Sequence, residues 1–440
     1  MSDPILGLVS LLVVVGAILT GFPMAFVFIF VALLFGYVAI GQQVFNLLTY
    51  QFFSLMTSVE LAAIPLFLFM GYVLDQSGLM DRMFNALQII LGKYKGSLYV
   101  IVLATATLFA AATGIVGASV TVLGVMAAPM LIRSNYDTRM SAGVIAAGGT
   151  LGILIPPSVM LIVMGPLVGV PVSTLFAAAV VPGLMLSGIY IIYTVIRCHI
   201  NPQLGPPIPY DGPPLSAMDK LRELTLGVIP ITIVIMATLG LIVGGVTTPT
   251  DAAATGTFAS LVLTAMYRRL TWRAVRIAVT KTMEVSAFIM FLIGAANFFG
   301  AVFARLGSGQ LITQTLTTLP VSPLIMLLLM LALIFVLGGP LEWIPIVLVV
   351  VPILLPVAHS LDFDILWFSI LVAVTLQTSW LTPPLALSSY FLKGVVPQWS
   401  MKDIYLGMVQ FVGLQLLVVG VLIKFPELVH WLPRVTGLLD

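Results

Sequence analysis

Two proline pairs stand out in this chain because each interrupts an apolar stretch long enough to cross a bilayer. One pair lies in GILIPPS, residues 152–158, and the other in SWLTPPLALS, residues 379–388. Proline lacks an amide hydrogen and clashes with the preceding helical turn, so each pair predicts a broken helix. Broken backbone at membrane depth persists only where it is buried in protein or lines a cavity. The freed carbonyls and neighbouring hydroxyls are hard oxygen ligands that suit an alkali cation.

The composition places these breaks in a membrane protein. Of 440 residues, 60% are hydrophobic and 8% are charged, whereas a soluble domain carries about 25% charged residues. The net charge of +2 gives no reason to expect a nucleic-acid partner, and the single Cys198 excludes an internal disulfide. Neither a Gly-rich phosphate loop nor a nucleophile–base pair is present, so we do not expect an enzyme or an ATP-driven pump.

The pattern of apolar stretches predicts an all-α polytopic fold with about ten transmembrane helices and two re-entrant hairpins. The stretches 97–131 and 322–358 are too long for single spans at about 1.5 Å per residue. Each has a Gly-rich break near its centre, TGIVGASVT (113–121) and LGGPLEW (337–343). We therefore expect a hairpin at each, followed by broken helices at 140–168 and 364–392. Amphipathic segments at 79–95 and 306–319 precede the hairpins and predict interfacial helices.

The chain divides into two halves that match in order. A Pro/Gly-rich connector, residues 201–222, separates residues 1–200 from residues 223–440. Three pairs of markers lie at offsets of 226, 224 and 227 residues: Pro23 with Pro249, Glu60 with Glu284, and Pro157 with Pro384. Such constant offsets predict an internal duplication.

Charges at the hairpin bases predict that the two repeats are inverted in the membrane. The first base carries Arg82, Lys93, Lys95, Arg133 and Arg139, while the second carries Arg305, His359, Asp362 and Asp364. Excess Lys and Arg marks the cytoplasmic side, so the two bases are expected on opposite sides. A further basic cluster is expected in a cytoplasmic loop: Arg268, Arg269, Arg273, Arg276 and Lys281.

Inversion would bring each hairpin tip beside the broken helix of its own half. The first sodium site is then expected at Thr113, Gly114, Gly117, Ser119, Ile155, Pro156, Pro157 and Ser158. The second is expected at Gly338, Gly339, Glu342, Thr382, Pro383 and Pro384. Half-helix N-termini favour an anionic substrate, for which we expect contacts from Ala118, Thr121, Thr375, Gln377 and Thr378.

Structural alternatives exist for the same residues. Gly and Ser within membrane helices also serve close helix packing, and a proline pair can be a simple kink. Glu342 could polarise the second site or cap the hairpin tip. Their shared position at paired breaks favours the site interpretation over the packing interpretation.

The ordered set of motifs resembles the large membrane subunit, DctM type, of TRAP transporters. It comprises the run from Arg82 to LGILIPPS, with IPLFLFMG (64–71), TTPTDAAA (247–254) and the late TPP (382–384). The resemblance implies sodium-coupled import of an organic acid anion such as a dicarboxylate, sialic acid or sugar acid. It further implies an elevator in which residues 97–168 and 322–392 move against a scaffold of residues 5–76, 173–197, 224–304 and 404–424.

The same resemblance implies the partners and the location. The implied partners are a separate small four-helix membrane subunit, a periplasmic substrate-binding protein and the lipid bilayer. The implied location is the bacterial inner membrane. Sodium ions would serve for coupling, with no other cofactor. A stand-alone sodium- or proton-coupled anion symporter, working without a binding protein, is the alternative.

Overall fold

The computed structural model describes residues 3–114, 116–208 and 216–439, and every regular element in these ranges is a helix. In order these are α1 (Pro4–Leu19), α2 (Met24–Ile40), α3 (Gln43–Met56), α4 (Ala63–Gln76), α5 (Leu79–Leu91), α6 (Ser97–Thr113), α7 (Val116–Arg133), α8 (Thr138–Thr150), α9 (Val159–Val168), α10 (Val172–Ile200), α11 (Ala217–Ile235), α12 (Leu241–Val243), α13 (Pro249–Met266), α14 (Trp272–Arg305), α15 (Ser308–Thr317), α16 (Pro323–Gly338), α17 (Trp343–Pro345), α18 (Val351–Ser360), α19 (Ile365–Gln377), α20 (Leu387–Val395), α21 (Met401–Lys424) and α22 (Glu427–Val435). Short 3-10 or π turns occupy Glu60–Ala62, Leu151–Ile153, Pro202–Leu204, Met236–Gly240, Ile346–Val350 and Thr378–Trp380.

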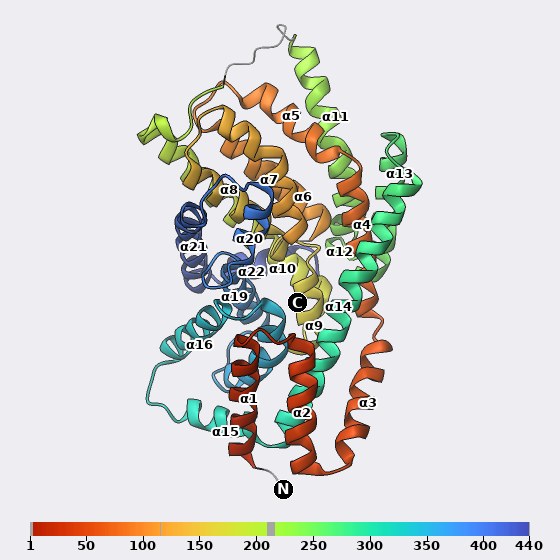
Figure 1. The fold of residues 1–440 in the computed structure, drawn as a ribbon, viewed down its shortest axis with the longest axis vertical. Helices are drawn as coiled ribbons and strands as arrows, with labels where there is room; N and C mark the ends of the chain where they lie inside the picture. Colours follow the sequence, from red (N-terminus) through yellow and green to blue (C-terminus); the bar gives the residue numbers. More distant parts are fainter. Residues whose placement is uncertain (1–2, 115, 209–215, 440) are drawn as a thin grey trace.

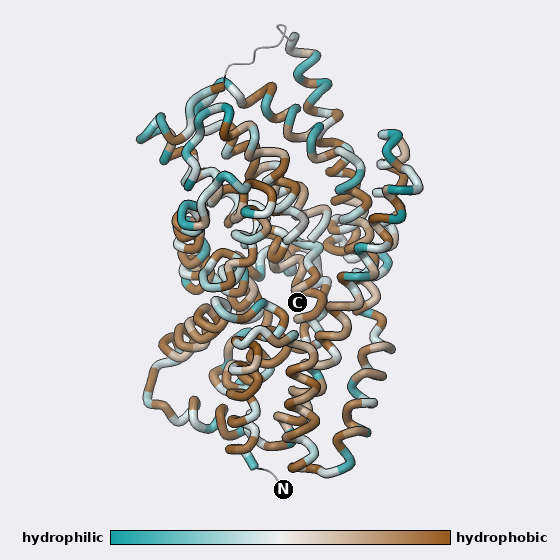
Figure 2. The backbone as a smooth tube through the Cα atoms, in the orientation of Figure 1, coloured by the Kyte–Doolittle hydropathy of each residue, from teal (hydrophilic) through white to brown (hydrophobic). Residues whose placement is uncertain are grey.

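The apolar character of these helices is that of a multi-pass membrane protein (Figure 2). Five helices in the described ranges are long and apolar enough to span a bilayer: Val172–Ile200, Met218–Val243, Trp272–Arg305, Trp343–Ser360 and Met401–Lys424. A sixth candidate is the pair α3–α4, which bends by 60° at its break. Seven further apolar helices have only 10–17 residues, so the expected total of about ten spans stays a prediction.

Each long apolar stretch folds as two helices joined by a turn at a glycine. In the first stretch, α6 ends at Thr113, Gly114 adopts a left-handed conformation (φ 63°), and α7 begins at Val116 and packs against α6. Only glycine takes this conformation without steric cost. In the second stretch, α16 ends at Gly338 and α17 begins at Trp343.

The helices that follow the hairpins are broken at the proline pairs. After α8, a 3-10 turn at Leu151–Ile153 leads through non-helical backbone to α9, which begins at Val159. After α19, a 3-10 turn at Thr378–Trp380 leads in the same way to α20. The peptide bond within each proline pair is cis.

Several features of the first half recur in the second half 227 residues later. Asp137 and Asp364 cap the N-termini of α8 and α19 through the same side-chain-to-backbone hydrogen bond. The two 3-10 turns stand at the same offset. Thr150 and Gln377, also 227 residues apart, contact each other directly, since Gln377 Nε2 donates to Thr150 Oγ1 at 3.1 Å.

The helices α10 and α21 pack on the body that contains the hairpins. α21 makes its most extensive contact with α8, and α10 packs against α6, α9 and α19. An added Cβ at Gly407 of α21 would overlap the carbonyl oxygen of Arg139, so the two backbones touch. Arg139 Nε and Asp403 Oδ1 form an ion pair at 2.8 Å across the same contact. Residues 173–197 and 404–424 therefore pack on the hairpin body, whereas we expected both segments in the scaffold.

A second body is formed by α2, α3, α4, α13 and α14. Threonines at seven-residue spacing on α13 donate to backbone carbonyls of α4 and of the segment just before it: Thr250 to Val59 at 3.2 Å, Thr257 to Leu66 at 3.0 Å and Thr264 to Val73 at 3.5 Å. Hydroxyl-to-carbonyl bonds of this kind join helices in an apolar medium. They hold α4 and α13 in one register along their length.

The two amphipathic helices lie at opposite ends of the molecule, α5 at the top and α15 at the bottom of Figure 1. The connector also departs from its expected bounds, because α11 begins at Ala217 and not after residue 222. The cause is a capping box, in which Ser216 and Asp219 exchange side-chain and backbone hydrogen bonds. Residues 209–215 of the connector lie outside the described ranges.

Candidate functional site

The first hairpin tip lies directly against the first proline break. A Cβ added at Gly114 would overlap the carbonyl oxygen of Pro157 and lie 3.2 Å from its carbonyl carbon. Ser158 caps α9 by accepting from Leu161 N at 3.5 Å, and its hydroxyl donates to the Ile153 carbonyl. Thr113 Oγ1 donates to Phe109 O at 2.9 Å, which leaves the lone pairs of its oxygen available to a cation.

The remaining residues expected at the first site lie around this contact. Ile155 packs against Gly183 of α10, while Ser119 is buried within α7. Gly117 faces the ring of Phe391, which a Cβ would approach to 3.0 Å. Pro156 precedes Pro157 in the break and is buried. The side chain of Ala118 lies outside the described part of the structure.

The second tip meets the second break in a corresponding way. Leu385 N donates to Gly339 O at 3.2 Å, and a Cβ at Gly339 would lie 3.2 Å from Pro383 O. A Cβ added at Gly338 would lie 3.0 Å from the Cβ of Ser379. Thr382 Oγ1 donates to Thr378 O at 2.8 Å, and Pro384 follows in the same non-helical turn. The structure thus brings Gly114 against Pro157 at the first break and Gly339 against Pro383 at the second.

A cavity of about 380 Å³ lies where both tips face the second body. Its lining includes four residues expected from the sequence: Gly114, Gly117, Ser158 and Glu342. The described lining residues that were not expected are Leu68, Tyr72, Val116, Ile153, Val159, Met160, Lys281, Val285, Phe288, Ile289, Trp343, Ile344, Trp380 and Phe391. Leu68 and Tyr72 come from α4, and four residues come from α14: Lys281, Val285, Phe288 and Ile289. The cavity therefore lies between the hairpin body and the second body.

Three helices begin at this cavity. Val116, Val159 and Trp343 are the first residues of α7, α9 and α17, and all three line it. A helix N-terminus presents unpaired N–H groups and about half a positive charge. Convergence of three such ends makes the cavity suited to an anion.

Lys281 supplies the cationic side chain among the described lining residues. Its Nζ lies 3.0 Å from Glu284 Oε2, one turn further along α14. We expected Lys281 in a loop, but α14 begins at Trp272 and includes Lys281 in its charged N-terminal part. The Lys–Glu spacing of three residues is typical of a helix face, and it is the signal that could have located Lys281.

Four expected substrate contacts are placed elsewhere, because the described lining residues do not include Thr121, Thr375, Gln377 or Thr378. Thr121 Oγ1 donates to Gly117 O at 2.8 Å and Thr375 Oγ1 to Leu371 O at 2.8 Å. Gln377 and Thr378 are completely buried. The Nε2 of Gln377 donates to Thr150 Oγ1, and this hydrogen bond joins the two halves of the chain.

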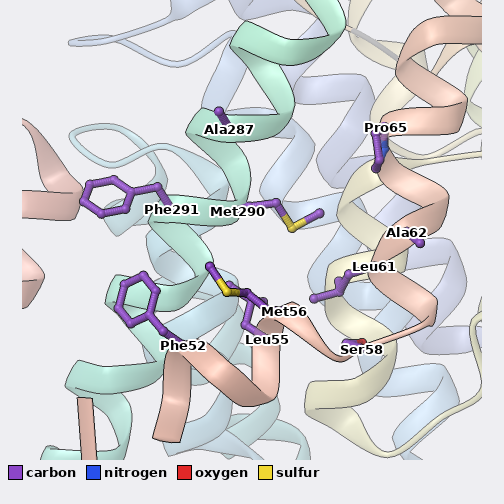
Figure 3. Close-up of a pocket in the computed structure, with 10 residues that line it drawn as sticks. All are labelled: Phe52, Leu55, Met56, Ser58, Leu61, Ala62, Pro65, Ala287, Met290 and Phe291. Carbon is purple, nitrogen blue, oxygen red and sulfur yellow. The ribbon is translucent and has the colours of Figure 1, made fainter. Parts of the chain in front are cut away.

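Another cavity, of about 420 Å³, opens at the bend between α3 and α4 (Figure 3). Its walls are almost entirely apolar, with Phe52 of α3 beside Phe291 of α14 on one side and Leu61, Ala62 and Pro65 on the other. It contains no charged side chain among its lining residues. Its chemistry therefore does not suit a small anion.

Comparison with known proteins identifies the family. Residues 11–428 match the model of the tripartite ATP-independent periplasmic transporter, DctM component. The chain belongs to the DctM family. It is therefore a membrane subunit of a TRAP transporter and not an enzyme, which confirms the resemblance seen in the sequence.

The relatives of this DctM chain carry different substrate names. It is 31% identical to the C4-dicarboxylate TRAP transporter large permease protein DctM of Rhodobacter capsulatus, over 78% of this chain and 80% of that one. It is 27% identical to the sialic acid large permease SiaM of Vibrio cholerae, over 86% and 87%. Among solved structures, the Alcanivorax borkumensis YdaH transporter has the same fold, with a TM-score of 0.62, 18% identity, and coverage of 88% and 90%.

Proposed function

We propose that this DctM chain is the translocating subunit of a sodium-coupled importer of an organic acid anion. The observation that carries the proposal is the cavity at which three helix N-termini converge between the hairpin body and the body of α4 and α14. Positive backbone ends favour an anion there. The names of the relatives, which include C4-dicarboxylate, sialic acid and isethionate transporters, agree with an organic acid.

Sodium is proposed to bind where each tip meets its break. Close approach of Gly114 to Pro157, and of Gly339 to Pro383, gathers backbone carbonyls around a buried turn. Hydroxyls of Thr113 and Thr382 donate to backbone and so can present oxygen to a cation. Carbonyl and hydroxyl oxygens are the hard, neutral ligands that suit a monovalent cation.

Transport is proposed to proceed by an elevator motion of two inverted repeats. Features that recur at an offset of 227 residues, together with α5 and α15 at opposite ends of the molecule, support the inversion. In this mechanism the hairpins, their broken helices, α10 and α21 move as one body. The helices α4, α13 and α14 stay fixed: the three threonine hydrogen bonds join α13 to α4 and the segment before it, and α14 packs against α4.

The partners are proposed from family membership. We infer a small membrane subunit and a periplasmic binding protein that delivers substrate, with the complex in the bacterial inner membrane. An isethionate relative from Oleidesulfovibrio alaskensis is named DctMQ, and this chain matches 56% of its length.

The test is uptake of radiolabelled organic acids into proteoliposomes that contain this chain and its small subunit. A sodium gradient is imposed, with and without the binding protein. We expect uptake to require both, whereas sodium-driven uptake without the binding protein would favour the stand-alone symporter. Failure of every acid tested to respond to sodium would contradict the proposed coupling.

Two proline variants test the ion sites in the same assay. Pro157→Ala and Pro384→Ala should let the broken helices become continuous and should abolish sodium stimulation. Pro230→Ala, which changes a helix-interior proline of α11 outside the proposed sites, is the matched control. Normal sodium-stimulated uptake by both site variants would refute the site assignment.

A further inference from the structure

We propose that this cavity selects organic acids with one anionic group and an apolar, aromatic-sized body, and that Lys281 of α14 contacts the anionic group. The inference rests on the proposed transport function and narrows its substrate class. It separates this chain from relatives named for dicarboxylates and for sialic acid, a polyhydroxylated acid.

The first step is the charge carried by the walls. Among the described lining residues, Lys281 is the cation and Glu342 is the carboxylate. A second anionic group would find no second cationic side chain among the described lining residues, so away from the helix N-termini it would lie near Glu342 or against an apolar wall. Both positions are unfavourable, the first by repulsion and the second by desolvation. A single anionic group therefore fits this charge distribution best.

The second step is the character of the walls around that charge. Five aromatic side chains line the cavity, Tyr72, Phe288, Trp343, Trp380 and Phe391. Trp380 and Phe391 are stacked, with ring centroids 6.3 Å apart and planes at 20°. Flat aromatic surfaces favour an apolar or aromatic body, whereas the hydroxyls of a sugar acid would lose water without finding partners there.

The polar groups available to a substrate body are few. Ser158 already uses its hydroxyl as a donor to the Ile153 carbonyl and as the acceptor that caps α9. The indole Nε1 of Trp380 is buried and has no hydrogen-bond partner among the described residues. One such donor can serve one acceptor atom of a ligand. Among the described lining residues, the remaining neutral side-chain donors are thus those of Tyr72, Trp343 and Trp380, fewer than the hydroxyls of a sugar acid require as partners.

The third step concerns the freedom of Lys281 to bind a ligand. Its side chain and that of its partner Glu284 are each 56% exposed, so neither is locked in the protein interior. An ammonium group has three donors, and Glu284 accepts at 3.0 Å, which leaves two for a carboxylate.

The experiment measures binding by intrinsic tryptophan fluorescence of the complex with its small subunit in lipid nanodiscs with sodium present. The probes are phenylacetate, succinate and gluconate. We expect saturable quenching by phenylacetate at a concentration at least about tenfold lower than for the other two acids. Trp343→Phe and Trp380→Phe should each reduce the amplitude, because both indoles line the cavity.

Lys281→Gln should weaken phenylacetate binding at least about tenfold, the contribution of one charge-assisted contact, and Lys281→Arg should restore most of it. The matched control is Arg276→Gln, which removes an exposed cation from the same helix outside the cavity lining. Tighter binding of succinate or gluconate than of phenylacetate would overturn the inference, as would unchanged binding by Lys281→Gln.

The outcomes separate this inference from the proposed function. Sodium-driven uptake of succinate, with no binding of phenylacetate, would overturn the substrate class and leave the transport function intact. Lys281-dependent binding of phenylacetate, with no response of its uptake to a sodium gradient, would support the substrate class and contradict the proposed coupling.

Discussion

Substitution of Gly114 by alanine tests the contact on which the first site depends. Gly114 has φ 63°, a conformation that costs an alanine about 1 kcal/mol. The added methyl would also overlap the carbonyl oxygen of Pro157, where a carbon–oxygen contact of about 3.3 Å is normal. Because the obstacle is buried backbone and cannot rotate away, tip and break would have to separate by about 1 Å.

A separation of that size should disable ion binding. Binding sites tolerate displacements of about 0.5 Å before they lose function, and backbone carbonyls near Pro157 are proposed to hold the ion. We therefore expect Gly114→Ala to lower sodium-stimulated uptake in proteoliposomes at least about tenfold, equivalent to about 1.4 kcal/mol or more. The sodium concentration for half-maximal uptake should rise correspondingly.

Gly169 provides the control for conformational strain. It ends α9 with φ 71°, and a Cβ there would meet nothing within 4 Å. Gly169→Ala therefore carries the same cost of about 1 kcal/mol for the left-handed conformation, without the overlap. The thermal unfolding temperature should then fall slightly in both variants, whereas sodium-stimulated uptake should fall only in Gly114→Ala. Equal sodium-stimulated uptake by the two variants would refute the reasoning about the tip contact.

Three further predictions follow from packing and charge elsewhere in the chain. Gly407→Ala should lower the thermal unfolding temperature more than Gly413→Ala, because a Cβ at Gly407 meets the backbone of α8 whereas one at Gly413 meets nothing within 4 Å; equal shifts would contradict the close packing of α21 on α8. Thr150→Val should destabilise the protein by about 1–3 kcal/mol in chemical unfolding, since it leaves the buried amide of Gln377 without that acceptor; an unchanged midpoint would argue against this hydrogen bond. Glu342→Gln should raise the sodium concentration for half-maximal uptake at least about tenfold, and an unchanged sodium dependence would remove Glu342 from the second site.

The breaks and tips could be predicted from sequence because local chemistry determines them. A proline pair interrupts a helix whatever surrounds it, and Gly114 ends a helix because its own backbone tolerates a left-handed conformation. The helix α3 was not foreseen, since its polar residues resemble those of a loop between spans. The family followed from the order of the motifs, which is also a property of the chain alone.

The walls of the cavity could not be predicted because they depend on contacts between distant residues. Gln377 looked like a substrate ligand, being a polar residue in an apolar span, yet it is buried and its Nε2 donates to Thr150 Oγ1 from the other half. Tyr72 and Lys281 reach the cavity only because α4 and α14 pack beside the hairpin tips. Sequence spacing carries no information about that approach.

The geometry also gives the proposed coupling a physical basis. Gly114, Gly117 and Ser158 belong to the first expected sodium site and also line the cavity, while Glu342 does the same for the second. A cation that orders a tip therefore acts on the same backbone that bounds the anion. Coupling free energy between two sites is reciprocal, so whatever factor sodium contributes to substrate affinity, substrate must contribute to sodium affinity. Shared wall residues make such a factor possible without any longer-range rearrangement.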